Sequence, residues 1–518
     1  DLGIDPEEFD PLDCEMGAPA PVCPPLAAVA EGPRAGGWAS ADLSARPNGA
    51  RERAGPYRTN GDAVERLEWL AQDLLDGHAE PPGAASATVL DHLRNEVLPT
   101  LRTCGPAERD AMLAGLNGRF IPPGPSGAPT RGRPDVLPTG RNFYSVDSRA
   151  VPTPAAWALG WNSAERLIEH HLQTHGDWPR TMLLTAWGTS NMRTGGDDIA
   201  QGLALMGCKP TWDGASRRVT GFEIIPLDHL ARPRVDVTLR VSGFFRDAFP
   251  AQMELFDSAA RAVMALDEPG DHNPAAARLH AEGGTDEAAY RVFGSKPGAY
   301  GAGLQAMIDE KLWERREDLA DAYLEWGGYA YGKGLEGTRA RNQLATRLAA
   351  TEAVVQNQDN REHDLLDSDD YYQFEGGAAA AVEHLRGQAP TIYHNDHSRP
   401  ERPVIRTLED EIGRVVRSRV VNPKWLNGAM RHGYKGAFEI AATVDYLFAF
   451  AATTHAVRSH HFDLVHEAVL EDDEVCGFIE DANPAALREI AQRLEEAIDR
   501  GLWQPRSNSA RARLESLL

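Results

Sequence analysis

The sequence predicts a mixed α/β fold of more than one domain, with parallel-type sheet segments, many helices and a largely helical C-terminal region. The first observation is the order strand, loop, helix between Arg180 and Gly207, where apolar, turn-rich and amphipathic stretches follow one another. The second is a pair of further strand candidates, at 221–226 and 235–241. The third is the mostly helical pattern of residues 423–518. Strands that alternate with helices favour a parallel sheet, whose ligands usually bind beyond the carboxyl ends of the strands.

Four segments are expected along the 518 residues. Residues 1–61 are predicted to be an irregular linker, because 17–60 is rich in Pro, Gly, Ala and Arg without periodicity. A small helical unit is expected at 62–137, an α/β domain at 138–300, and a mainly helical catalytic and C-terminal region at 301–518. The sequence begins with Asp1 rather than Met, so we expect it to be a piece of a longer polypeptide.

Composition excludes several classes of protein. A formal charge of -24 and a pI near 5.2 argue against a nucleic-acid partner, because phosphate binding needs a basic surface. The longest apolar run, near 446–452, is far shorter than the ~20 residues of a membrane span, and no signal peptide opens the sequence. The five cysteines form no CxxC pair, which fits a reducing compartment. We therefore expect a cytoplasmic protein without a membrane span.

The stretch 391–425 has the highest density of side chains that can bind a metal or transfer a proton. A β-branched and aromatic opening leads into His394, Asn395, Asp396 and His397, and an arginine-lined helix follows from Thr407. Imidazole and carboxylate suit a borderline divalent ion and can also move protons. We therefore predict a metal site whose ligands are His394, Asp396 and His397. The alternative is a surface turn whose histidines are hydrated.

The stretch 356–375 contains the densest acidic cluster. Together with the stretch above, it supplies the candidate catalytic residues, which are Asp359, His363, Asp370, Glu375, His394 and Asp396. A run of charges is more often a solvated surface, and that alternative stays open. The aromatic residues Tyr371, Tyr372 and Phe374 argue against a purely solvated segment.

Three further stretches contain candidate ligand-binding residues. The loop after the strand at 181–187 places Thr189, Asn191 and Arg193 at the expected ligand edge. The motif at 138–147 and the arginine-rich segment at 231–257 are polar as well, although loop capping or an Arg–Asp network that braces the sheet would explain them equally. The sequence contains no GxxxxGK[ST] motif, so it does not encode ATP hydrolysis by a phosphate loop.

Taken together, the stretches 140–147, 185–201, 232–252, 356–372 and 391–425 resemble the C-terminal part of the large subunit of the ATP-dependent metal chelatases, the CobN and magnesium chelatase H family. The resemblance implies insertion of Co(II) into hydrogenobyrinic acid a,c-diamide in aerobic cobalamin biosynthesis. The alternatives are insertion of Mg(II) into protoporphyrin IX and a non-catalytic tetrapyrrole-binding scaffold. The resemblance also implies two partner subunits, an AAA+ ATPase and its companion with an integrin-type domain, which hydrolyse ATP with magnesium.

The resemblance further suggests which residues bind the ring. Tetrapyrroles carry carboxylate or carboxamide arms, and guanidinium groups are suited to carboxylates. The predicted ring-binding residues are Asn142, Asp147, Thr189, Asn191, Arg193, Arg234, Arg246, Arg406 and Arg417. Metal insertion also requires removal of two pyrrole protons, which is the work expected of the acidic and histidine residues named above.

Overall fold

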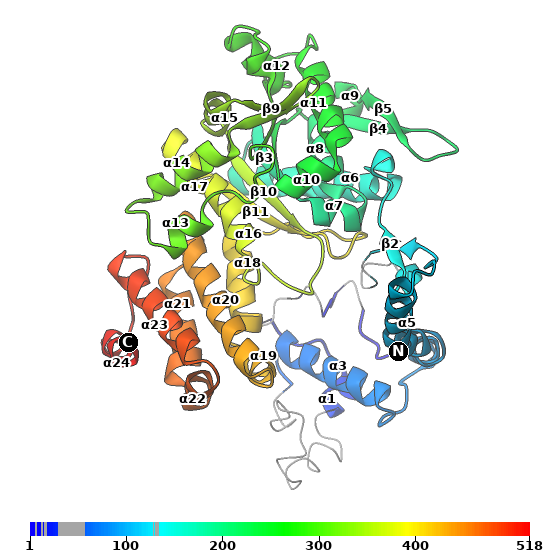
Figure 1. Ribbon diagram of the computed structural model, residues 1–518, viewed down its shortest axis with the longest axis vertical. Helices are drawn as coiled ribbons and strands as arrows, with labels where there is room; N and C mark the ends of the chain where they lie inside the picture. The colour runs from blue at the N-terminus through cyan, green and yellow to red at the C-terminus, as the bar shows by residue number, and fades with distance from the viewer. Residues whose placement is uncertain (6–7, 12–13, 15–17, 30–56, 128, 130–133) are drawn as a thin grey trace. The chain divides into compact units, whose positions relative to one another are not determined.

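The computed structural model describes residues 1–5, 8–11, 14, 18–29, 57–127, 129 and 134–518 (Figure 1). The described chain divides into two compact units. The first comprises Asp1–Pro129 and Pro134–Tyr144, and the second comprises Ser145–Leu518. The predicted linker at 1–61 belongs largely to the first unit, although its segment 30–56 lies outside the described residues.

The first unit is built mainly from helices. Its elements are α1 (Pro24–Ala28), α3 (Asn60–Leu75), α4 (Ala84–His92), η2 (Leu93–Val97), α5 (Leu98–Leu116), η4 (Pro134–Val136) and the short parallel pair β1 (Gly124–Pro125) and β2 (Asn142–Tyr144). α3 begins with a capping box, in which the Thr59 hydroxyl accepts from the Asp62 amide and the Asp62 carboxylate accepts from the Thr59 amide. Leu26 of α1 packs with Ala63 of α3 in a small core.

The second unit is organised around a seven-stranded sheet in the order β11-β10-β3-β6-β7-β8-β9. The first five strands run parallel, and β8 and β9 continue the sheet antiparallel. The bounds are β3 (Thr181–Ala186), β6 (Asp236–Val241), β7 (Val292–Gly294), β8 (Tyr329–Gly332), β9 (Leu335–Arg339), β10 (Ala353–Gln358) and β11 (Thr391–Asp396). The predicted mixed α/β fold is confirmed.

Helices cover both faces of this sheet, as Figure 1 shows. Side chains alternate along each strand, so Met182 and Leu184 belong to one core and Leu183 belongs to the other. The core that includes Met182 is formed with α6 (Pro154–His175), α8 (Asp197–Met206) and α11 (Pro250–Met264). The core that includes Leu183 is formed with α14 (Arg316–Gly327), α15 (Arg341–Leu348), α17 (Gly377–Arg386) and the C-terminal helices.

Short elements join these layers. They are η5 (Ser148–Ala150), α7 (Gly188–Thr194), α9 (Leu227–Leu230), α10 (Gly243–Ala248), α12 (Pro274–Ala281), η6 (Glu287–Ala289), α13 (Gln305–Asp309), α16 (Asp369–Tyr371) and η7 (Tyr372–Gly376). A separate antiparallel ribbon contains β4 (Cys208–Trp212) and β5 (Val219–Ile224). The predicted division at residue 300 falls inside the sheet, because β7 pairs with β8 and β3 pairs with β10.

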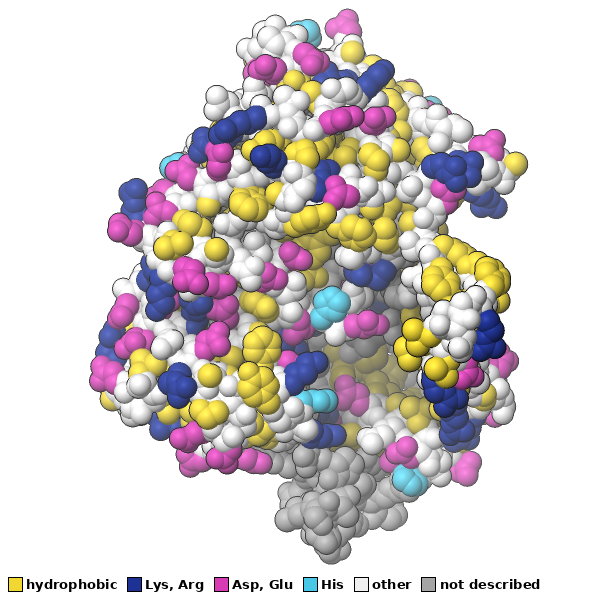
Figure 2. Space-filling view, viewed as in Figure 1, with side chains coloured by type: hydrophobic (Ala, Val, Ile, Leu, Met, Phe, Trp, Pro, Cys, Tyr) yellow, Lys and Arg dark blue, Asp and Glu magenta, His cyan; other side chains and the backbone are white. Residues whose placement is uncertain are grey.

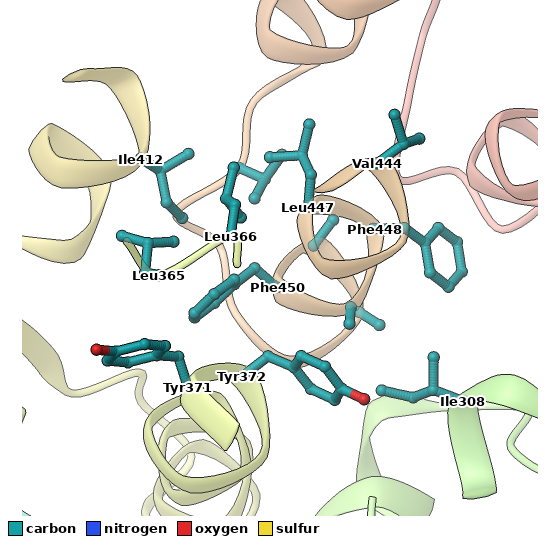
Figure 3. Close-up of a cluster of buried hydrophobic side chains, with 14 of the residues drawn as sticks. Ile308, Leu365, Leu366, Tyr371, Tyr372, Ile412, Val444, Leu447, Phe448 and Phe450 are labelled. Carbon is teal, nitrogen blue, oxygen red and sulfur yellow. The ribbon is translucent and has the colours of Figure 1, made fainter. Parts of the chain in front are cut away.

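The C-terminal region is helical, as the sequence indicates. Its elements are α18 (Leu408–Val415), η8 (Val416–Val420), α19 (Pro423–Met430), α20 (Tyr434–Thr453), α21 (Ser459–His466), η9 (Glu467–Glu471), α22 (Asp473–Ala482), α23 (Pro484–Asp499) and α24 (Ser509–Leu517). Figure 3 shows side chains of α20 packed around Tyr372 and Leu366 in the buried core. α20 is long and apolar enough to cross a membrane, but 72% of its most apolar window is buried inside the protein, as in a core helix.

α6 approaches α8 closely at Gly160. A Cβ at this position would lie 2.6 Å from the backbone nitrogen of Gln201 and 2.7 Å from the Cβ of Ala200. We expect Gly160→Val to reduce the free energy of unfolding by about 3 kcal/mol, because the added atoms force the two helices apart. Urea unfolding followed by circular dichroism measures this change. Gly214→Ala, where the added Cβ has no atom within 4 Å, is the matched control.

Candidate functional site

The carboxyl ends of parallel strands meet at one edge of the sheet and bring two polar stretches together. Gln356, Asn357 and Gln358 of β10 lie opposite His394, Asn395 and Asp396 of β11. Because side chains alternate, His394 and Gln358 lie on the face covered by η7, and Asn357 and Asn395 lie on the face covered by α8. The edge therefore carries a polar cluster on each face.

On the first face, His394 is buried between two acceptors. Its Nδ1 lies 3.0 Å from Oε2 of Glu375, and its Nε2 lies 3.0 Å from Oε1 of Gln358. The orientation of the Gln358 amide is fixed, because its nitrogen donates to the carbonyl oxygens of Asn360 and His363. The Nε2 of His394 must then donate to Gln358, and its Nδ1 shares a proton with the Glu375 carboxyl group.

The surroundings of this pair raise the pKa of both groups. Burial lowers the pKa of His394, but the Glu375 carboxylate outweighs burial and raises it above its usual value. Burial also raises the pKa of Glu375, although the neighbouring His394 opposes this shift. Both groups of the His394–Glu375 pair therefore hold a proton more firmly than they would in water, and their hydrogen bond joins them into one proton-sharing pair.

On the second face, a buried network joins α6, α8 and both strands. The Asn357 amide donates to Asp198 at 2.8 Å and to Gln201 at 2.7 Å, and its oxygen accepts from Asn395 at 3.0 Å. Asp198 also accepts from the Asn191 amide at 2.6 Å. Burial, and then the neighbouring Asp197, raise the pKa of Asp198. We call these residues the α8 network, together with Asp197, His397 and Ser163.

His397 connects the loop after β11 to the α8 network. Its Nδ1 lies 2.8 Å from Oδ2 of Asp197, and its Nε2 lies 2.7 Å from the Ser163 hydroxyl. Gln201 donates to the same hydroxyl at 2.9 Å. A carboxylate only accepts, so Nδ1 donates to Asp197, while Nε2 forms the second hydrogen bond with the Ser163 hydroxyl. All these side chains are fully buried, which makes the connection a structural support for the strand ends.

Arginine–carboxylate pairs frame the same edge. Arg193 of α7 donates to both oxygens of Asp359, at 2.7 and 2.8 Å. Arg361 donates to Asp396, and Arg406 lies 3.6 Å from Asp396 and 3.7 Å from Glu411. The edge therefore contains Asp359, Glu375, His394, Asp396, Asn191, Arg193 and Arg406 among the residues predicted from sequence.

Two other predicted arginines, Arg234 and Arg246, are occupied by contacts within the fold. Arg234 precedes β6, at the opposite edge of the sheet, where it is buried against Glu268 and three backbone carbonyl groups. Arg246 binds Asp247 and the carbonyl oxygens of Lys296 and Ala299. Both arginines thus brace the fold, which is the alternative that the sequence left open.

The remaining predicted residues are at the surface or in the first unit. Asn142 lies in β2 of the first unit and donates to the carbonyl oxygens of Pro125 and Val136. Asp147 pairs at the surface with Arg149 and Arg218. Thr189, His363, Asp370 and Arg417 are exposed. Burial of its carboxyl group, and then the charge of Asp369, raise the pKa of Asp370 to about 6, even though much of the residue is solvent-accessible.

The three predicted metal ligands do not converge. His394 and His397 point to opposite faces of the sheet, and Asp396 is held by Arg361. Within the described residues, no group of three or more His, Cys, Asp or Glu side chains is arranged to hold a metal ion. A cavity of about 710 Å³, lined by Lys311, Trp313, Arg316 and Arg500 among others, belongs to the helical region and includes none of the edge residues.

Sequence reasoning missed several residues of the edge. Ser163, Asp197, Asp198, Gln201 and Gln358 make the contacts that hold the two histidines and Asn357. The turn-rich stretch 188–194 forms helix α7, which carries Arg193 to Asp359. The sequence signal for this edge was the alternation of polar residues in a buried strand, where Gln356 and Gln358 lie on one face.

Asp396 makes the stability of the second unit depend on pH. Burial favours the neutral acid, but Arg361 and Ser398 outweigh it and lower the pKa from 3.8 to about 2. The depressed pKa stabilises the fold by about 2 kcal/mol above pH 3.8, and this contribution is lost as the pH falls through 2.

We expect Asp396→Asn to cost about 2 kcal/mol at pH 7 and about half of that at pH 3. Urea unfolding of both proteins at the two pH values measures the difference. An equal difference at pH 7 and pH 3 would contradict the ion-pair assignment.

The chain is similar to proteins of one family over most of its length. The sequence model of the family described as CobN/Magnesium Chelatase matches residues 33–510. The chain is 61% identical over 527 residues to the aerobic cobaltochelatase subunit CobN of Sinorhizobium sp, covering 99% of this chain and 40% of that protein. It is 37% identical over 401 residues to the magnesium-chelatase H subunit of Rhodobacter capsulatus, covering 76% of this chain and 33% of that protein.

A solved structure shows the same fold. The catalytic subunit of cobaltochelatase from Mycobacterium tuberculosis superposes with a TM-score of 0.82 at 44% identity, over 92% of this chain and 41% of that one. The chain thus spans about two fifths of the length of the cobaltochelatase relatives described here.

Proposed function

Because the chain belongs to the CobN/magnesium chelatase family, we propose that it forms the C-terminal part of the large, tetrapyrrole-binding subunit of an ATP-dependent cobaltochelatase. The proposed reaction is insertion of Co(II) into hydrogenobyrinic acid a,c-diamide. The higher identity to the cobaltochelatase relative, 61% against 37% for the magnesium-chelatase relative, favours cobalt over magnesium. This single observation carries the choice of ion.

The edge of the sheet offers groups that could bind the ring. Four buried polar atoms there have no hydrogen-bond partner among the described residues, namely Nε1 of Trp187, Oγ of Ser190, Oδ1 of Asn191 and Oδ1 of Asn395. Unsatisfied buried groups are costly, so an edge that keeps four of them is suited to a polar ligand or ordered water. We propose that the arms and pyrrole nitrogens of the ring bind at this edge of the sheet.

Proton removal is assigned to the groups with raised pKa. The Glu375 carboxylate can accept a pyrrole proton as the N–H bond breaks, and its hydrogen bond to Nδ1 of His394 lets that proton move between the two groups. Asp370, with a pKa of about 6, is exposed and can exchange protons with solvent. In this proposal cobalt is a substrate, and His394 or Asp396 would ligate it only after their present partners release them.

Partner subunits complete the proposed enzyme. The sequence has no phosphate loop, so ATP hydrolysis is assigned to an AAA+ subunit with its companion of the integrin-domain type. The full-length subunit, assembled with these partners, should insert Co(II) into hydrogenobyrinic acid a,c-diamide in an absorbance assay. Insertion of Mg(II) into protoporphyrin IX, with no cobalt activity, would reject the choice of ion. Ring binding without insertion of either metal would favour a scaffold.

A further inference from the structure

Three exposed aromatic side chains form a row beside the candidate site, which we call the aromatic row: Phe244, Tyr300 and Trp326. Their exposed fractions are 40%, 59% and 42%. Phe244 lies in α10 directly after β6, and Tyr300 lies in the loop after β7, so both follow carboxyl ends of parallel strands. Figure 2 shows a group of hydrophobic side chains on this face, above the hollow at its centre.

Each aromatic side chain of the row is packed against a glycine. A Cβ on Gly188 would lie 2.7 Å from the Phe244 ring, and one on Gly243 would lie 2.6 Å from the Tyr300 ring. A Cβ on Gly303 would lie 3.0 Å from Trp326. Larger residues at these positions would displace the rings, so the backbone fixes where the three aromatic groups lie.

Hydrogen bonds hold the row further. The Trp326 indole donates to the carbonyl oxygen of Tyr300 at 3.1 Å, and the Tyr300 hydroxyl donates to Asp247 at 2.8 Å. The Arg246 guanidinium lies over the Tyr300 ring, 5.5 Å from its centre. Exposed aromatic groups that are already ordered can bind a flat apolar ligand with little loss of conformational entropy.

The row is continuous with the candidate site. Trp187 precedes Gly188 and packs on Tyr371 with ring centres 4.7 Å apart, and Tyr371 lies 5.5 Å from His394. The loop after Tyr300 is tied to η7, because the Ala302 amide donates to Gln373 at 3.4 Å. A chain of packed aromatic rings therefore connects the His394–Glu375 pair to α7, against which the row lies.

We propose that the aromatic row binds one face of the planar conjugated macrocycle while the polar edge receives its polar groups. This inference rests on the proposed function and adds to it the residues that position the ring. The row makes no contact with the reacting atoms in this account. Its loss should raise the dissociation constant of the ring and leave the insertion rate at saturating ring nearly unchanged.

The test uses the full-length subunit and hydrogenobyrinic acid a,c-diamide, titrated by fluorescence quenching. Phe244→Ala and Trp326→Ala should each weaken ring binding by about 10-fold or more, as for loss of a stacking partner. Tyr300→Phe, which keeps the ring, should bind nearly as the wild type does. Phe438→Ala removes an aromatic side chain that is 54% exposed in α20, and this matched control should leave binding unchanged.

Unchanged ring affinity in folded Phe244→Ala and Trp326→Ala proteins, checked by thermal melting, would overturn the proposal. Weaker binding of a partner subunit with unchanged ring affinity would also overturn it and identify the row as a protein interface. If the wild-type subunit binds no tetrapyrrole in the same titration, the proposed function itself fails. This outcome is read from the wild type alone and so differs from failure of the aromatic row.

Discussion

Replacing His394 with asparagine is expected to lower the rate of cobalt insertion by about 100-fold or more, as for loss of a residue that transfers protons. Asparagine can still donate a hydrogen bond to Glu375, but it carries no titratable proton and cannot pass one on. The affinity for the ring should change little, since other groups bind it. Single-turnover insertion by the full-length subunit with its partners, together with ring titration, measures both quantities.

The control for this prediction is His432→Asn, which replaces an exposed histidine between α19 and α20 and should keep full activity. Glu375→Gln should lower the rate to a similar extent, because the two residues act as one pair. A His394→Asn subunit that binds the ring and inserts cobalt at the wild-type rate would remove this pair from the mechanism.

Replacing His397 with alanine is expected to reduce the free energy of unfolding by about 3 to 5 kcal/mol, because it leaves the buried Asp197 carboxylate without its imidazole partner. The Ser163 hydroxyl also loses its contact with Nε2. Although His394 and His397 are close in sequence, substitution of His394 should affect mainly the insertion rate, and substitution of His397 should affect mainly the stability of the fold. Equilibrium urea unfolding of the wild type and the variant measures the loss.

Two variants sharpen this second test. His397→Asn keeps a donor for Asp197 and should recover part of the stability. His229→Ala, an exposed histidine of α9, should change the stability by less than about 0.5 kcal/mol. Equal stability of His397→Ala and wild type would mean that the α8 network does not support the strand ends.

The sequence predicted the main features of the edge because polar residues interrupt otherwise apolar strands there. The parallel arrangement and the ligand edge at Thr189, Asn191 and Arg193 followed from local patterns, and the aromatic residues of η7 indicated that the acidic stretch is not purely solvated. The position of His394 and Asp359 at the carboxyl ends of strands is a result of the structure. The alternative of a hydrated surface turn at residues 394–397 is wrong, since His394 is 1% exposed and His397 is 0% exposed.

What the sequence could not provide is the side on which each residue lies and which distant group meets it. His394 and His397 look like one ligand pair in the sequence, but the last residues of β11 alternate between faces and the two rings separate. Ser163 and Asp197 are 234 and 200 residues from His397, and no local signal connects them. The Arg234 guanidinium could bind a carboxylate arm of the ring, but Arg234 precedes β6 and is paired with Glu268. Its role there is to brace the fold.

The central claim is that metal insertion occurs at the carboxyl ends of β3, β10 and β11, beside His394 and Glu375. The most direct measurement is a structure of the full-length subunit with bound tetrapyrrole. The account predicts the ring over these strand ends, with its nitrogens turned toward the His394–Glu375 pair. A ring bound elsewhere, with His394 still enclosed between Glu375 and Gln358, would contradict it.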